Sequence, residues 1–246
     1  MNINWYYFAS PTTFYRLAGR IAPWAFVLAV ITGAAGLYLG LVVAPTDAQQ
    51  GEVYRVIFIH VPAAWMSMFL YFVMACYGAL SLTFNTRLGA MMARSLAPTG
   101  AMFTFVSLWT GSFWGRPTWG TYWVWDARLT SELVLLFLYF GFIALANAFE
   151  DPRRGDRASA LLALIGLVNL PIIYFSVLWW NTLHQGSSVS LRGTSMHVTM
   201  LWGMLAMAFS FWMYSVGTAF TRVRAIILER ERRTRWVRGL VAGAHS

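Results

Sequence analysis

Charged residues are scarce in this chain of 246 residues: Asp, Glu, Lys and Arg together make up 11%, and lysine is absent altogether. Apolar residues make up 59%. A soluble domain of this length could not cover its surface with so little charge, because charged side chains normally make up about a quarter of a soluble chain. The composition therefore predicts a membrane protein and excludes a soluble globular domain.

Several chemical signatures are also missing. The single cysteine, Cys76, lies inside an apolar run, so a disulfide framework and a Cys-x-x-Cys redox pair are both excluded. The sequence has no Cys-x-x-Cys-His haem-attachment motif and no Walker motif for the use of ATP. Residues 1–10 contain no basic stretch ahead of a short apolar core. We therefore expect no cleaved signal peptide, and the first apolar run should stay in the membrane.

The chain does contain apolar runs that reach the roughly 20 residues needed for one membrane crossing. They predict an all-α, polytopic membrane protein in which residues 1–246 form a single domain with six transmembrane helices. Pro62 falls in the second run and Pro171 in the fifth, and neighbouring helices can satisfy the carbonyl groups that these prolines free. The predicted spans are residues 21–43, 56–82, 96–113, 131–149, 159–180 and 197–220.

The arginines predict the orientation of the chain. Fourteen of the 18 lie before the first span, between spans two and three, between spans four and five, or after the sixth, all on one side of a six-span protein. The positive-inside rule makes that side cytoplasmic, so both termini are predicted to be cytoplasmic. The net charge of +9 is therefore a topology signal. We expect the arginine-rich tail, residues 221–246, to lie against anionic lipid headgroups and not to bind nucleic acid.

The predicted outer-face loop between spans three and four, residues 115–130, is aromatic, whereas a membrane loop is normally short and polar. Such a surface suits a large, planar, apolar ligand with a few charged edges. An aromatic belt at headgroup level is the alternative. An acid among indoles is costly unless it is paired, so the acid of this loop is expected to pair with the nearby arginine. The aromatic and charged residues concerned are Trp119, Trp123, Trp125, Asp126 and Arg128.

Three of the four histidines fall on the same predicted side as this loop. His60 begins the second span, His184 follows the fifth, and His197 opens the sixth. Two imidazoles from different helix ends, beside an aromatic platform, are what six-coordinate haem iron requires, and arginines would pair with the anionic propionates. A hydrogen-bonding role at a helix end remains open for each histidine. A zinc site is a weaker option, because no His-Glu-x-x-His spacing occurs and no cysteine joins the cluster.

Residues 119–130, with the sequence WGTYWVWDARLT, resemble the tryptophan-rich WWD signature of the haem-handling proteins of bacterial cytochrome c maturation. The chain as a whole resembles the six-span members of that group, the haem exporter protein C family. Two segments are similar to the histidine segments of the family: HVPAA at residues 60–64 and WWNTLHQG at residues 179–186. The similarity covers about residues 10–186, so His197 gains nothing from it.

The resemblance implies a function and a set of functional residues. It implies that the protein binds haem b, as its transported ligand, at the periplasmic face of the bacterial inner membrane, and passes it to a membrane-anchored haem chaperone. His60 and His184 would be the axial ligands of the haem iron. The haem-binding loop would consist of Trp119, Trp123, Trp125 and Asp126. Candidate partners for the propionates are Arg128 together with Arg55 or Arg192. We expect Asp126 to shape the loop by holding Arg128.

The resemblance also implies partners: a small single-span membrane protein and the subunits of an ABC transporter. The chain itself is expected not to be an enzyme. One alternative is a cytochrome c haem lyase, although such proteins are typically longer and have more spans and a soluble domain. The other alternative is an electron-transfer subunit with a bis-histidine haem. Such subunits usually bury their histidines in mid-bundle, whereas His60 and His184 lie at predicted helix ends.

Overall fold

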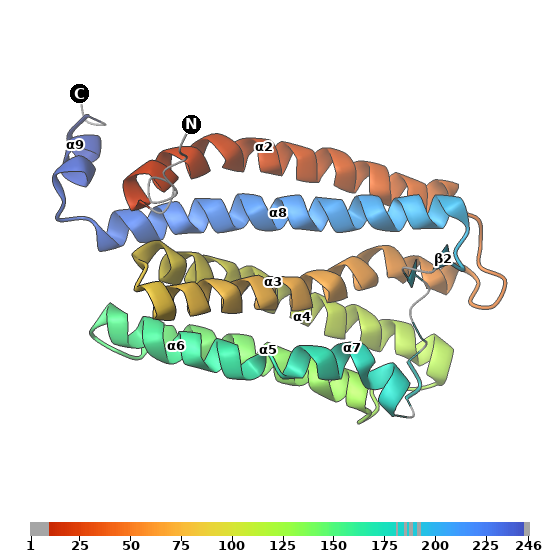
Figure 1. The fold of residues 1–246 in the computed structure, drawn as a ribbon. Coiled ribbons are helices and arrows are strands. Elements are labelled where there is room, and N and C mark those ends of the chain that lie inside the picture. The colour runs from red at the N-terminus through yellow and green to blue at the C-terminus, as the bar shows by residue number, and fades with distance from the viewer. Residues whose placement is uncertain (1–9, 181, 185, 187–188, 191–192, 244–246) are drawn as a thin grey trace.

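The computed structural model describes residues 10–180, 182–184, 186, 189–190 and 193–243. Over these residues the chain forms a bundle of long helices with one short antiparallel hairpin (Figure 1). The elements in chain order are α2 (Pro11–Tyr38), the π-helical turn η1 (Leu39–Val43), the 3₁₀ turn η2 (Glu52–Val56), α3 (Ile57–Phe84), α4 (Arg87–Trp119), α5 (Ala127–Asn147), α6 (Pro152–Gly166), α7 (Asn169–Trp179), β1 (Val189–Ser190), β2 (Gly193–Thr194), α8 (Val198–Arg230) and α9 (Arg235–Gly243).

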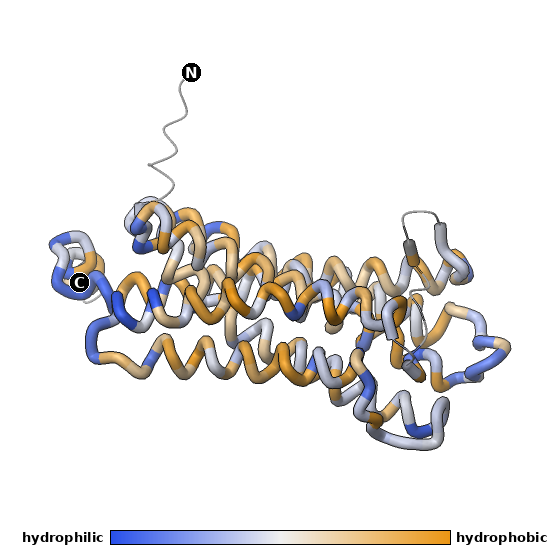
Figure 2. Tube along the Cα trace, turned by 60° about the horizontal axis from the view of Figure 1, so that its bottom comes forward, coloured by the Kyte–Doolittle hydropathy of each residue, from blue (hydrophilic) through white to orange (hydrophobic). Residues whose placement is uncertain are grey.

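The helices run between the two ends of the bundle and confirm the predicted all-α, polytopic fold. Five stretches are long and apolar enough to cross a membrane: Pro11–Val43, Glu52–Phe84, Ala127–Asn147, Pro152–Trp179 and Val198–Arg230. α4 runs the length of the bundle among them and adds a sixth pass (Figure 1). Because the number of passes is even, α2 begins and α8 ends at the same end of the bundle. Figure 2 shows apolar residues along the middle of the bundle and hydrophilic residues mainly at its two ends.

α4, which contains the third predicted span, is not among the five most apolar stretches, and it packs against α3, α5 and α8 inside the bundle. Three of its buried hydroxyl groups, those of Ser95, Thr104 and Thr110, donate to carbonyls of α4 itself, as Thr104 does to Gly100 at 2.8 Å. Small residues on α4 also allow close approach, and the ring of Tyr139 on α5 fills the space that a Cβ at Gly100 would need. The buried hydroxyl residues of α4 are Ser95, Thr99, Thr104, Ser107 and Thr110.

The fifth predicted span consists of two helices, α6 and α7, with a break at Leu167 and Val168. Pro171 explains the break, because a proline has no N–H for the carbonyl four residues earlier and its ring clashes with that carbonyl. The carbonyl concerned belongs to Leu167, and it accepts instead from the N–H of Leu170 at 3.1 Å. Pro62 lies near the start of α3 and leaves that helix unbroken.

Helices extend into two segments that were predicted to lie outside the membrane spans. The aromatic loop predicted at residues 115–130 is non-helical only at residues 120–126, because α4 continues to Trp119 and α5 begins at Ala127. Gly120 ends α4 with a left-handed φ of 81°, a conformation that favours glycine. The tail predicted at residues 221–246 is largely helical in its described part, because α8 extends to Arg230 and α9 follows.

An ion-pair network joins three passes at the end of the bundle where α2 begins and α8 ends. Asp156 on α6 accepts from both terminal nitrogens of Arg230 on α8, at 2.6 and 2.7 Å. It also lies 3.4 Å from Arg94 on α4. Arg94 donates in addition to the Ala146 carbonyl at 2.6 Å. One carboxylate, with a side chain only 9% exposed, therefore holds the ends of α4, α6 and α8 together.

We predict that Asp156→Ala lowers the free energy of unfolding by about 2–4 kcal/mol, because it leaves two partly buried arginines without their carboxylate. Thermal melting of the purified protein in detergent measures the loss. Asp151→Ala is the matched control, since it removes an exposed acid from the same helix and should cost only the α6 cap, about 1 kcal/mol. Equal losses in the two variants would contradict the structural role of the network.

Candidate functional site

The end of the bundle away from the start of α2 contains a mainly apolar cavity of about 210 Å³. Its walls come from α3, α4, α5, α7, α8 and the segment between α7 and α8. A smaller cavity of about 40 Å³ shares part of this wall. Four residues line both cavities: His60, Trp114, Arg128 and His184. The structure therefore brings together both predicted histidines and one of the predicted arginines.

His60 lies in the first turn of α3 and is 7% exposed. The ring of Trp114 contacts it edge-on, with centroids 5.5 Å apart. Its Nδ1 lies 3.1 Å from the hydroxyl oxygen of Thr110. That hydroxyl donates its own proton to the Val106 carbonyl at 2.6 Å, so its oxygen accepts from the Nδ1–H of His60. This tautomer leaves the Nε2 lone pair available to a metal.

His184 lies on a short irregular segment after α7. Its ring is 6.2 Å from the ring of His60, centroid to centroid, with 32° between the two planes, and 5.9 Å from the ring of Trp119. The backbone N–H of His184 donates to the hydroxyl oxygen of Thr182 at 3.1 Å. That hydroxyl donates in turn to Oδ2 of Asp126. The predicted loop acid thus holds the segment that carries the second histidine.

The prediction that Asp126 pairs with Arg128 is wrong. Oδ1 of Asp126 caps α5 by accepting from the N–H of Leu129 at 2.8 Å, and no ion pair joins the two side chains in the described residues. Side chains two positions apart do not face each other at a helix start. Arg128 instead donates to the Ile173 carbonyl of α7 at 2.6 Å, which places its guanidinium group in the cavity wall.

The tryptophans of the loop divide into two groups. Trp119, the last residue of α4, lines the smaller cavity. Trp123 and Trp125 pack edge to face with centroids 5.4 Å apart and line neither cavity, and Trp125 is 77% exposed. Trp114 was missed by the sequence analysis, although its Nε1 donates to Gln50 at 2.8 Å and its ring lies against His60. The sequence could have placed Trp114 at the site only through a prediction that α4 continues beyond residue 113, as it does to Trp119.

Three other residues named by the sequence analysis lie elsewhere. His197 is exposed, lines neither cavity, and caps α8 by accepting from the N–H of Thr199 at 3.3 Å. Arg55 lines neither cavity and donates to the carbonyls of Gly40 and Ala44, at 2.6 and 3.2 Å. Arg192 lies outside the residues that the structure describes.

A buried acid, Glu132, was not predicted as part of the site. It lies on α5 one turn after Arg128, is 5% exposed, and lines the smaller cavity. Its Oε1 accepts from the hydroxyl of Ser67 at 2.8 Å, whereas Oε2 has no hydrogen-bond partner in the described part of the chain. An acid inside a membrane bundle is costly and usually serves function. Glu132 is therefore a candidate functional residue.

The fold and this site define an integral membrane protein of the all-α class with two facing histidines at one end of its bundle. A family model described as Heme exporter protein C matches residues 4–238. Heme exporter protein C of Escherichia coli strain K12 is 46% identical over 235 residues, which are 95% of this chain and 94% of that protein. The protein of the same name from Bradyrhizobium diazoefficiens is 48% identical over 92% of this chain and 86% of its own length.

A protein of Marchantia polymorpha, described as a putative cytochrome c biosynthesis ccmC-like mitochondrial protein, is 48% identical over 79% of this chain and 83% of its own length. The family model and the Escherichia coli and Bradyrhizobium diazoefficiens matches extend over nearly the full chain. The chain belongs to the haem exporter protein C family.

We predict that Asp126→Ala loosens both the start of α5 and the segment that carries His184. The change removes an N-cap and the acceptor of the Thr182 hydroxyl, and should cost about 1–2 kcal/mol. Amide hydrogen exchange measures both effects locally. Thr182→Val is the matched variant: it removes the contact with Asp126 but keeps the cap, so exchange should quicken at residues 182–184 and not in α5. Unchanged exchange at residues 182–184 in both variants would show that Asp126 does not hold this segment.

Proposed function

We propose that this protein holds haem b at the cavity between His60 and His184, and hands it to a membrane-anchored haem chaperone during the biogenesis of c-type cytochromes. The family supports haem delivery as the function. The observation that supports the site is the separation of 6.2 Å between the two imidazole rings.

This separation matches two ligands on one metal. A metal–imidazole bond is about 2 Å long and the ring centre lies about 1 Å behind the bonded nitrogen, so two trans imidazoles have centroids about 6 Å apart. The hydrogen bond between Thr110 and Nδ1 of His60 supports the same role, because ligand histidines normally donate their second ring N–H to a fixed partner.

The volume of the cavity limits how much of a haem it can enclose. Its volume of about 210 Å³ is below the roughly 300–1,000 Å³ of pockets that enclose small ligands. A porphyrin bound between the histidines therefore extends beyond the cavity walls, where Trp119 and the exposed Trp125 offer apolar ring faces. Arg128 would pair with a propionate. Trp123 would support Trp125 by edge-to-face packing, and Asp126 would act through the His184 segment without touching the haem.

We further propose that residues 1–246 act as one six-span domain in the bacterial inner membrane, with both termini in the cytoplasm and the haem site at the periplasmic face. The support is the arginine distribution: the end of the bundle at which α2 begins carries most of the arginines, and the histidine cavity lies at the other end. Haem bound at the cavity would therefore be presented on the side where c-type cytochromes are assembled.

Membership of the family also supports a set of proposed partners for this protein. They are the haem chaperone, a small single-span membrane protein and the subunits of an ABC transporter, with no nucleic acid. ATP hydrolysis belongs to the transporter, since this sequence has no Walker motif. In this proposal the chain is a delivery component, so it carries no catalytic residue. Haem lyase activity and electron transfer have no support from the family.

His60→Ala and His184→Ala should each reduce the haem that co-purifies with the protein by more than about tenfold and abolish its low-spin visible spectrum, because each removes an axial ligand. His197→Ala is the matched control. It removes a histidine from the same end of the bundle but from outside both cavities, and should leave the spectrum unchanged. If the control lost the low-spin spectrum while the other two variants kept it, the ligand assignment would be wrong.

Thr110→Val should weaken haem binding about 10–100-fold, because it removes the acceptor that fixes the tautomer and orientation of His60 while keeping the size of the side chain. Titration of the purified protein with haem measures the affinity. Thr104→Val makes the same change two turns earlier on α4, where the hydroxyl bonds only the Gly100 carbonyl, and should bind haem normally. Equal affinities for the two variants would exclude the orienting role of Thr110.

A further inference from the structure

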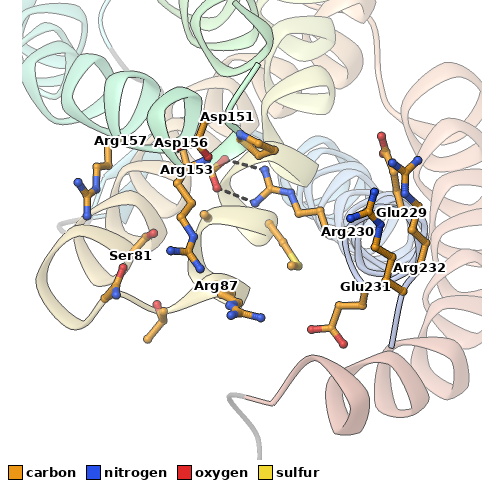
Figure 3. Close-up of a pocket in the computed structure, with 16 residues that line it drawn as sticks. Ser81, Arg87, Asp151, Arg153, Asp156, Arg157, Glu229, Arg230, Glu231 and Arg232 are labelled. Atoms are coloured by element: carbon orange, nitrogen blue, oxygen red, sulfur yellow. Dashed lines mark hydrogen bonds and ion pairs between the residues drawn. The ribbon is translucent and has the colours of Figure 1, made fainter. Parts of the chain in front are cut away.

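A larger cavity, of about 580 Å³, lies at the opposite end of the bundle, where α8 ends. Figure 3 shows it between the turn that joins α3 to α4, the start of α6 and the last turn of α8. The proposed haem function does not use this cavity, because both histidines lie at the other end. Its wall contains six arginines and four acidic residues, so it does not suit an apolar porphyrin.

The acids of this wall are mostly engaged within the protein. Asp156 bonds Arg230 and Arg94. Asp151 caps α6 by accepting from the N–H of Arg153 at 3.0 Å, and Glu231 accepts from Nε1 of Trp236 at 2.7 Å. Only Glu229 stands exposed without such a contact in the described residues. The carboxylates therefore neutralise few of the arginines that face the cavity.

Two arginines are directed into the open part of the cavity. Figure 3 shows Arg87 from α4 and Arg153 from α6 reaching into the same space, while Arg230 is bonded to Asp156. No ion pair or side-chain hydrogen bond reaches the guanidinium group of Arg87 or Arg153 within the described chain. Two converging guanidinium groups without a carboxylate are a typical phosphate-binding arrangement.

The start of α4 adds to this positive field. α4 has 33 residues, and the side chain of its cap residue Thr86 bonds none of its first N–H groups. Thr86 and Arg87 both line the cavity. The positive end of a long helix dipole, with uncapped N–H groups, favours a bound anion at the same place as the two arginines.

We propose that this cavity binds a phosphate group, supplied by the headgroup of an anionic phospholipid. The membrane-crossing stretches that end at Phe84 and Arg230, and the one that begins at Pro152, all meet at this cavity, so it lies at the depth of lipid headgroups. Basic pockets between helix ends on the arginine-rich side of a membrane protein commonly hold such lipids. This is a defined site for one lipid, distinct from the general attraction between the exposed tail arginines and the membrane surface.

The test compares two double variants of the full-length protein. Arg87→Gln with Arg153→Gln removes the converging pair. Arg16→Gln with Arg20→Gln is the matched control, since it removes two exposed arginines from the same end of the bundle but from outside the cavity. Each protein is delipidated in detergent, incubated with phosphatidylglycerol and phosphatidylcholine, washed, and analysed by native mass spectrometry for retained lipid. A parallel arm measures thermal stabilisation by inorganic phosphate, and equal melting temperatures without ligand verify folding.

We expect the wild type and the control to retain one phosphatidylglycerol selectively, and the cavity variant to lose this lipid by on the order of tenfold or more. If inorganic phosphate stabilises the wild type but not the cavity variant, and no lipid is retained, the phosphate site stands and its source is free phosphate. Equal retention and equal phosphate response in all three proteins would overturn the proposal. So would a cavity variant that binds lipid and phosphate normally but loses a co-purifying transporter subunit, because the cavity would then be a protein interface.

Discussion

Every polar group in the middle of this bundle must find its partner inside the protein, because the hydrocarbon layer of a membrane offers none. α4 shows how the chain meets this constraint: the buried hydroxyls of Ser95, Thr104 and Thr110 donate to carbonyls of the same helix. A helix built in this way can be both polar and buried, and its small side chains let α3 and α5 pack closely. Thr110 is one of these hydroxyls, so the requirement that stabilises α4 also orients His60.

The same constraint makes Glu132 informative. Its Oε1 bonds Ser67, and the hydroxyl of Tyr139 bonds the Ser67 carbonyl at 2.8 Å, so one side of the acid is well satisfied. Its Oε2 has no hydrogen-bond partner among the described residues, and the side chain lines the smaller cavity together with both histidines. A glutamine or a leucine at this position would avoid the cost of burying an incompletely bonded acid and would make the protein more stable. The presence of Glu132 on the wall of the proposed haem site indicates a role that requires charge or a proton.

Most of the fold could be predicted from the sequence, because a membrane span is a property of a continuous run of residues. The less accurate parts depend on contacts between distant residues. α4 was predicted too short at both ends, since its polar residues face other helices and not lipid. The break before α7 follows from Pro171, but the sequence did not show whether neighbouring helices would keep the span continuous.

The site residues, like the helices, divide into those that the sequence predicts and those that depend on contacts between distant residues. His60 and His184 could be selected from their motifs, and the structure brings their rings together. The partner of Asp126 could not be predicted, because three helices, α5, α6 and α7, separate Asp126 from Thr182 in the chain. Trp114 and Glu132 were missed for a similar reason: each lies on a helix that looks like an ordinary span, and only packing directs it to the cavity.

The two histidines are anchored very differently. His60 is embedded in α3, packed against Trp114 and held at Nδ1, whereas His184 lies on a short non-helical segment connected to the bundle through Thr182 and Asp126. In the proposed complex the iron would therefore have one firmly held ligand, His60, and one more readily exchanged ligand, His184. Dissociation would begin on the His184 side and leave a five-coordinate iron still bound to α3. A ligand from the proposed haem chaperone could then take the place of His184 before His60 dissociates, so the haem would pass between the two proteins without being released into the membrane.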